Sequence, residues 1–209
     1  MKHYSQISYS QSYKQMDKKF IFTDEELISR FQNGEEQAYI ELVNRYRDRL
    51  MSFIYRFVND QVAAEDIVQD TLVKLYTHKD YYRNIAKFST WIYTIAGNLA
   101  KTELRKNKRR KVTNLSDMGS DDWEFEIPAK EDTAEEVHNQ FDGEQINKAI
   151  QTLPDHFREV IILRDIQELS YDEISNITKL ALGTVKSRIN RARLQLQKEL
   201  KDLKKEKNF

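Results

Sequence analysis

The feature that most constrains this chain is the recurrence of apolar residues at steps of three and four. The clearest example runs from about Glu36 to Val58, where one stripe of a helix would collect Tyr39, Leu42, Val43, Tyr46, Leu50, Phe53, Ile54 and Phe57. The chain has only 5 Gly and 2 Pro among its 209 residues, which disfavours the many tight turns of a β-sandwich or barrel. The sequence therefore predicts an all-α protein with almost no β-strand.

Capping residues divide the first half of the chain into further helices. Thr23 and Glu26 have the spacing of a capping box at the start of a short first helix. Asp60 is suited to cap the third helix. Ser89 is suited to cap a long fourth helix, which would begin at the next residue and end in a basic run at residues 101–111.

The formal net charge of zero conceals a separation of charge along the chain. Residues 112–145 hold eleven acidic residues and one lysine, a net charge of −10, so the rest of the chain carries +10. The acidic stretch has no sustained apolar period, which indicates a flexible linker between two small helical domains. The predicted organisation is a disordered extension at 1–22, a first domain at 23–111, the linker at 112–141 and a second domain at 142–209.

The second domain has the spacing of a helix-turn-helix. Ser170 and Glu173 form a capping box for a helix of two turns, a turn follows at Lys179 to Leu182, and a longer helix comes next. When that helix buries its apolar stripe, its exposed face carries Lys, Ser, Asn and Arg side chains, which supply the donors and acceptors that reading base edges in a major groove requires. The alternative is an amphipathic hairpin with a solvated basic face.

Both domains resemble conserved parts of the extracytoplasmic-function (ECF) sigma factors, the smallest branch of the sigma-70 family. The second domain resembles their region 4 through Leu153-Pro154, Arg158-Glu159-Val160, Leu163-Arg164 and the segments LSYDEI (169–174), GTVKSRI (183–189) and RAR (191–193). The first domain resembles region 2 through the segments AEDIVQD (64–70) and FSTWIY (88–93) and through Asn98. The likeness spans about residues 24–202, with the two motifs in the family's order.

The resemblance implies a sigma factor that binds core RNA polymerase and directs promoter-specific transcription initiation. Region 2 would hold the clamp helices of the β′ subunit and melt the minus-ten element, while region 4 would hold the β flap and read the minus-thirty-five element. The implied polymerase contacts are Asp66, Gln69 and Asp70, which share one helix face and suit a basic partner. Without the resemblance, a plain solvated face explains these three residues better.

The resemblance also implies two sets of DNA contacts. The minus-ten set combines aromatic and basic side chains, which can capture unstacked bases and neutralise phosphates; it comprises Tyr82, Arg83, Lys87, Phe88, Trp91, Asn98, Lys101 and Arg105. Trp91 also has the spacing of a core residue with Ile95. The minus-thirty-five set comprises Arg164, Thr184, Lys186, Ser187, Asn190 and Arg191. The turn departs from the family pattern because Leu180 offers no side-chain acceptor to cap the recognition helix, whose first residue is therefore left open.

Other classes of protein agree less well with the sequence. A helix-turn-helix transcriptional regulator that is not a sigma subunit would need a receiver or ligand domain, and the first half has no alternating βα pattern. The chain has no Cys, and its His residues show no spacing typical of metal binding or nucleophilic catalysis. We therefore expect no enzymatic activity, no cofactor and no metal.

The expected location and partners follow from the same observations. The chain shows neither a signal peptide nor an apolar stretch of membrane-spanning length, so we expect a cytoplasmic bacterial protein without membrane insertion, at the nucleoid when bound to polymerase. The implied partners are core RNA polymerase, promoter DNA and an anti-sigma factor or other regulator.

Overall fold

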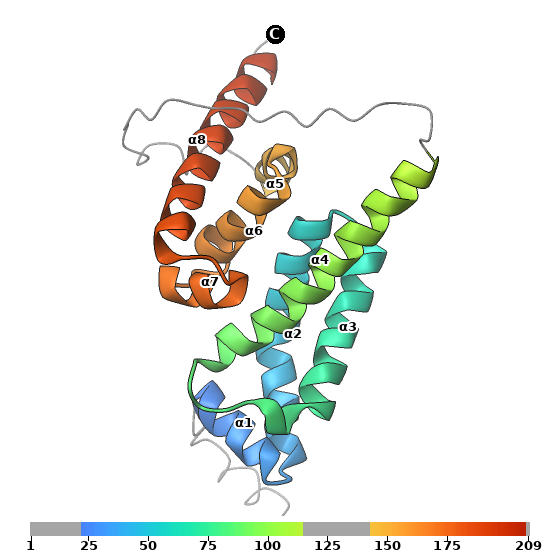
Figure 1. Cartoon of the computed structure of the whole chain (residues 1–209), viewed down its shortest axis with the longest axis vertical. Coiled ribbons are helices and arrows are strands. Elements are labelled where there is room, and N and C mark those ends of the chain that lie inside the picture. The colour runs from blue at the N-terminus through green and yellow to red at the C-terminus, as the bar shows by residue number, and fades with distance from the viewer. Residues whose placement is uncertain (1–21, 115–142, 208–209) are drawn as a thin grey trace, which may run out of the picture.

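The computed structural model describes residues 22–114 and 143–207, all of its regular structure within these ranges being helical (Figure 1). The expectations for the extension and the acidic linker fall almost entirely outside the described residues. Phe22 is an exception, because the Arg30 guanidinium lies 3.9 Å above its ring and its carbonyl accepts a hydrogen bond from Arg45. Phe22 therefore contacts the first domain, whose predicted start is residue 23.

Four helices form the N-terminal domain: α1 (Asp24–Gln32), α2 (Glu36–Val58), α3 (Gln61–Thr77) and α4 (Phe88–Asn114). The capping box of Thr23 and Glu26 is confirmed, and the Asp60 side chain accepts from Ala63 N at the start of α3. The stripe predicted for α2 is the centre of the core, where Leu42, Leu50, Phe53 and Ile54 are completely buried.

The start of α4 differs from the prediction. The helix begins at Phe88, and its first amide donates 2.9 Å to Glu25 Oε1 of α1. Ser89 lies inside the helix, and its hydroxyl donates instead to Glu173, 84 residues further along the chain. A carboxylate from α1 thus caps α4 in place of the predicted local serine.

The C-terminal domain contains α5 (Gly143–Thr152), α6 (Asp155–Ile161), α7 (Tyr171–Thr178) and α8 (Leu182–Lys207). The capping box of Ser170 and Glu173 at α7 is confirmed. The helix after Pro154, expected to continue to about Ile166, ends as an α-helix at Ile161 and passes into one π-helical turn at Ile162–Ile166.

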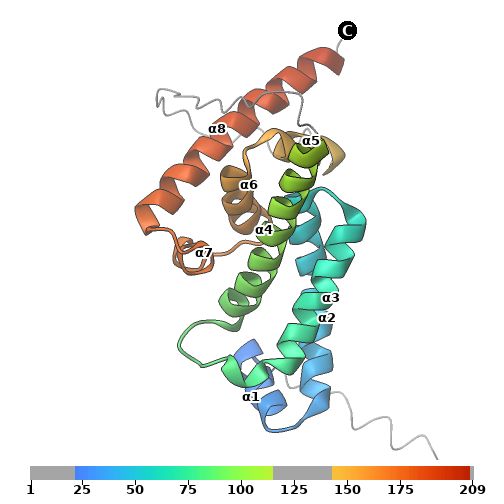
Figure 2. The ribbon, with the colours of Figure 1, turned by 45° about the vertical axis from the view of Figure 1, so that its right-hand side comes forward.

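The two domains pack against each other and share one continuous hydrophobic cluster. Helix α4 lies between α3 on one side and α6 and α7 on the other, as both views show (Figures 1 and 2). The π-helical turn and α5 contact α2. The sequence predicted two separately folded domains on a tether and did not predict this contact.

Candidate nucleic-acid and protein interfaces

The exposed face of α3 carries the three residues implied in polymerase binding. Asp66, Gln69 and Asp70 are all exposed, and no hydrogen bond or ion pair within the described part of the chain engages their side chains. Val62 and Val73 lie on the same stripe of the helix, with 70% and 57% of their surface exposed. The face therefore joins an acidic and amide centre to two exposed apolar side chains, a composition typical of a protein contact. Sequence reasoning missed both valines, because an apolar residue in a helix is first assigned to the core.

The loop between α3 and α4 includes a short 3₁₀ helix at Lys79–Tyr81 and an aromatic cluster beneath it. Tyr82 and Phe88, both expected to contact DNA, are 6% and 0% exposed, and the two rings pack 5.9 Å apart between centroids. The Tyr82 hydroxyl donates to Ala86 O within the loop. Burial argues against direct base contact by either ring and assigns both to support of the loop.

Trp91 lies at the edge of the same cluster. Its ring packs against Tyr82 and Phe88 at centroid distances of 5.6 and 6.0 Å, while part of its surface stays accessible. The spacing argument for a core position is thus partly correct. A base could reach only the open part of this ring.

Helix α1 fastens the loop through its C-terminal turn. The Gln32 amide donates 2.8 Å to Lys79 O and 3.0 Å to Tyr82 O, and Lys79 Nζ donates 2.8 Å to Phe31 O in return. Together with the Glu25 cap on α4, these bonds fix both ends of the loop to α1. Nothing in the local sequence indicates that Gln32 holds the loop, because its hydrogen-bond partners lie about fifty residues away.

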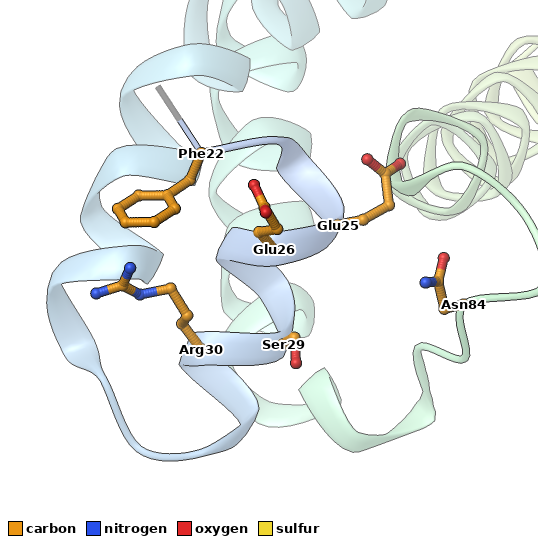
Figure 3. Close-up of a pocket in the computed structure, with 6 residues that line it drawn as sticks. All are labelled: Phe22, Glu25, Glu26, Ser29, Arg30 and Asn84. Carbon is orange, nitrogen blue, oxygen red and sulfur yellow. The ribbon is translucent and has the colours of Figure 1, made fainter. Parts of the chain in front are cut away.

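A cleft of about 400 Å³ lies between α1 and Asn84 of this loop (Figure 3). It is lined by Phe22, Glu25, Glu26, Ser29, Arg30 and Asn84. Both glutamates cap helices, and the Arg30 guanidinium is paired with Glu35 at 2.7 Å. Two carboxylates at the cleft disfavour the binding of a phosphate there.

The remaining residues of the minus-ten set lie on the loop and along α4. Arg83, Asn98 and Arg105 are exposed. Lys101 is half-buried and pairs with Glu159 at 2.8 Å, and Lys87 pairs with Glu173 at 3.5 Å. The structure therefore gathers the polar members of the set at the loop and α4, but engages two of the cations with acids of the C-terminal domain.

The recognition helix presents two distinct faces. Val185, Ile189 and Ala192 are buried. Opposite them the helix exposes Lys186, Ser187, Asn190 and Arg191, as expected of a groove-facing set. Thr184 is half-buried, and its carbonyl accepts from the Ser187 hydroxyl.

The structure settles where the recognition helix begins. The first helical residue is Leu182, and the Val185 amide donates to Ala181 O, so the N-cap residue is Ala181, whose side chain has no polar group. Lys179 ends α7 in the left-handed conformation, with φ of 60°. The turn is thus formed by residues 179–181, one residue fewer than predicted.

Two arginines near this helix are held by their own domain. Arg164, expected to contact the DNA backbone, donates 2.8 Å to Leu169 O and lies 4.7 Å from the centre of the Tyr171 ring. Arg193 forms two hydrogen bonds to the Asp165 carboxylate, at 2.6 and 3.0 Å. A phosphate contact by Arg164 would therefore use the part of its guanidinium that these contacts leave accessible.

Two further properties concern the described residues as a whole. No three of their His, Asp and Glu side chains converge as metal ligands do. None of the helices within 22–114 and 143–207 is both long and apolar enough to cross a bilayer.

Comparison with known proteins identifies both halves of this architecture. Residues 42–110 match the family model of sigma-70 region 2, and residues 143–196 match that of sigma-70 region 4. An RNA polymerase sigma-H factor of Pseudomonas aeruginosa is 33% identical over 193 residues, covering 88% of this chain and 96% of the relative. The ECF RNA polymerase sigma factor SigW of Bacillus subtilis is 34% identical over 179 residues, covering 84% and 96%.

Solved structures show the same fold. The sigma factor RpoE of Bartonella quintana, crystallised with the anti-sigma factor NepR, superposes with a TM-score of 0.62 at 29% identity, covering 78% of this chain and 96% of that one. CnrH in complex with the cytosolic domain of CnrY also gives a TM-score of 0.62, at 22% identity, covering 86% and 97%.

A helical domain that matches sigma-70 region 2, followed by a helix-turn-helix domain that matches sigma-70 region 4, defines the class of protein as a sigma factor. The chain belongs to the sigma-70 family and, within it, to the ECF sigma factors. It is accordingly a transcription initiation factor rather than an independent helix-turn-helix regulator.

Proposed function

We propose that the three motif-bearing surfaces divide the work of promoter recognition. The α3 face around Asp66, Gln69 and Asp70 binds the clamp helices of the β′ subunit, with Val62 and Val73 adding apolar contact. The loop and α4 face, through Arg83, Lys87, Trp91, Asn98, Lys101 and Arg105, holds the melted minus-ten strand. The exposed face of α8 enters the major groove of the minus-thirty-five element, and its domain binds the β flap.

The observation that carries this division is the two-faced character of α8. A buried stripe fixes the helix on its own domain, so the side chains of Lys186, Asn190 and Arg191 are held outward and can meet base edges together. The same logic applies to α3, whose buried Ile67 and Val68 hold the acidic face toward solvent. Acidic side chains there complement a basic polymerase helix and steer its encounter.

An anti-sigma factor is proposed as a further partner. Support comes from the Bartonella quintana relative, whose structure holds a sigma factor together with an anti-sigma factor. We also place the protein in the bacterial cytoplasm, at the nucleoid when it is part of the holoenzyme, because its polymerase and promoter partners are there.

Reconstitution with bacterial core polymerase on a library of promoter fragments tests the proposal. The expected result is a set of start-site-specific transcripts that share two short sequence elements upstream of the start. Binding of duplex DNA without core binding and without transcripts would contradict it.

A further inference from the structure

The aromatic side chain of Tyr171 lies where the segments that carry the proposed minus-thirty-five contacts meet. Tyr171 is the first residue of α7, and both views place α7 beside the start of α8 (Figures 1 and 2). The π-helical turn at Ile162–Ile166, which contains Arg164, also packs against α7. The Tyr171 ring can therefore contact side chains both from the turn before α7 and from the recognition helix after it.

The position of this ring is fixed by the start of α7. Ser170 and Glu173 form a complete capping box, in which Glu173 N donates 3.2 Å to Ser170 Oγ and Ser170 N donates 3.0 Å to Glu173 Oε2. A cap sets the backbone of the residue that follows it, and with it the direction of that side chain. Tyr171 is half-buried and packs against the hydrophobic cluster. Cap and core thus hold the ring, while part of it stays at the surface.

Two cations of the proposed minus-thirty-five set lie over the Tyr171 ring. The guanidinium carbon of Arg164 is 4.7 Å from the ring centre, and Nζ of Lys186 is 5.9 Å from it. At such distances the electron-rich face of an aromatic ring attracts a cation. Within residues 22–114 and 143–207, neither cation forms an ion pair with a carboxylate.

Arg193 shows the other way in which this domain holds a cation. Its guanidinium is fixed by two hydrogen bonds to the Asp165 carboxylate, at 2.6 and 3.0 Å. The negative charge of the carboxylate offsets the attraction of this arginine for a phosphate. An aromatic ring holds a cation without adding a negative charge. Arg164 and Lys186 are therefore held in place with their full charge available to DNA.

Holding these two side chains in advance lowers the cost of binding. Lysine and arginine have long, flexible side chains that lose rotamer freedom when a ligand orders them. A side chain that is already placed loses less on binding, so the complex is tighter. The hydrogen bond from Arg164 to Leu169 O, 2.8 Å long, adds a second restraint on this arginine.

From these contacts we propose that Tyr171 is a positioning residue for minus-thirty-five recognition, whose ring holds Arg164 and Lys186 without neutralising them. The inference rests on the proposed function of α8 in the major groove. Arg164 is assigned to the DNA backbone and Lys186 to the base edges, so one ring links a contact that sets the position of the protein to a contact that reads sequence. The spacing between the two contacts is thus fixed before DNA binds.

Two substitutions of Tyr171 in the full-length chain separate the ring from the rest of the side chain. Tyr171→Leu removes the ring but keeps an apolar side chain toward the core. Tyr171→Phe keeps the ring and removes only the hydroxyl, so it should restore every property that depends on the ring. Circular dichroism and urea titration check that each variant is folded.

The first readout is the placement of the two cations without DNA. A proton over the face of an aromatic ring resonates upfield, so the Arg164 Hδ and Lys186 Hε signals should lie upfield in NMR spectra of the wild type. They should stay there in Tyr171→Phe and move to the positions of exposed side chains in Tyr171→Leu. The Arg191 Hδ signals, from an exposed arginine of the same helix, should not move. Wild-type signals at the positions of exposed side chains would overturn the contact.

The second readout is the affinity of the reconstituted holoenzyme for a duplex that carries the minus-thirty-five element selected from the promoter library. At one fixed salt concentration, Tyr171→Leu should weaken binding about tenfold, because two side chains must then be ordered by the DNA. Tyr171→Phe should stay within about twofold of the wild type, since it keeps the cation–π contacts.

A double-mutant cycle shows whether Tyr171 acts through the two cations. In the Arg164→Ala, Lys186→Ala background, adding Tyr171→Leu should change affinity by less than about twofold, because no cation remains to be placed. In the matched Arg191→Ala background, the same substitution should still cost about tenfold, because Arg191 does not contact the ring.

The possible failures are distinct. A tenfold loss in all three backgrounds, or wild-type affinity of Tyr171→Leu, would overturn the positioning role and leave the proposed function standing. A wild-type holoenzyme that binds the selected element no better than bulk DNA would instead contradict the proposed function of α8.

Discussion

Lys101 of α4 and Glu159 of α6 form an ion pair across the domain boundary, with 2.8 Å between Nζ and Oε1. One member belongs to the face proposed to hold the minus-ten strand, and the other to the domain proposed to read the minus-thirty-five element. The pair therefore links the two halves of promoter recognition in a single contact, and its charge state should control how firmly they associate.

The contact between the two domains should depend on pH through Glu159. Burial raises the pKa of this carboxyl, although the charges of Lys101 and Arg188 act to lower it. When the two domains separate, the carboxyl regains its ordinary pKa of about 4.5, so the domain contact favours the protonated group. The contribution of this group to the domain contact is complete below that ordinary pKa and is lost as pH rises through the raised one.

Fluorescence energy transfer measures this dependence in a chain that has no native Cys. Dyes on Asn44→Cys and Lys198→Cys, both exposed, report the fraction of protein in which the two domains are in contact. Glu173 acts in the opposite direction: burial raises its pKa, but hydrogen bonds from Ser170 and Ser89 and the charge of Lys87 hold it below the usual value. The Glu159 contribution is therefore the difference between the wild type and Glu159→Gln. A difference that does not change with pH would contradict the prediction.

Reversing the charge of the α3 face should separate polymerase binding from DNA binding. Asp66→Arg with Asp70→Arg places two cations where a basic helix is expected, and it should weaken core binding at least tenfold. Duplex binding through α8 should not change, since the two surfaces lie on different domains. Fluorescence anisotropy with labelled core and labelled promoter DNA measures both. Parallel loss of the two affinities would indicate a damaged fold.

Arg191 should act as a base reader. Arg191→Ala is expected to cost the holoenzyme about 1–3 kcal/mol on its preferred minus-thirty-five sequence and much less on bulk DNA. Lys198→Ala, an exposed cation further along α8, is the matched control. Equal losses on specific and bulk DNA would make Arg191 a phosphate contact instead.

Gln32 should control the minus-ten loop without touching DNA or polymerase. Gln32→Met keeps the length of the side chain but removes both donors to the loop, so promoter opening should slow several-fold while core affinity stays constant. Loss of these hydrogen bonds should lower the free energy of unfolding by about 1–2 kcal/mol, measured by urea titration. Gln37→Met, exposed on α2, should change neither quantity. An unchanged opening rate in Gln32→Met would show that α1 does not position the loop.

Local signals predicted most of the helices correctly. The capping boxes at Thr23 and Ser170 and the cap at Asp60 place three helix starts where the structure has them, because each involves residues three positions apart. The predicted start of α4 was wrong because the residue that caps this helix is Glu25, 63 residues earlier in the chain. No periodicity within one segment contains that information.

Among the candidate site residues, too, properties set by the local helical period were predicted correctly and those set by distant contacts were not. Exposure of Asp66, Asn190 and Arg191 follows from the helical period and was predicted correctly. The period does not distinguish an aromatic residue that stacks on a base from one that supports a loop, so Tyr82 and Phe88 were placed on the DNA surface although they are buried. The domain contact was missed because acid–base partners far apart in sequence leave no pattern in either segment.

Permanganate footprinting of the reconstituted holoenzyme, on a promoter selected from the library, tests the central division of labour most directly. The wild type should expose unpaired thymines at the minus-ten element and protect the duplex upstream. In Arg83→Ala with Asn98→Ala the unpaired thymines should be lost while the upstream protection remains. Upstream protection without unpaired thymines in the wild type, or loss of both signals in the variant, would contradict the account.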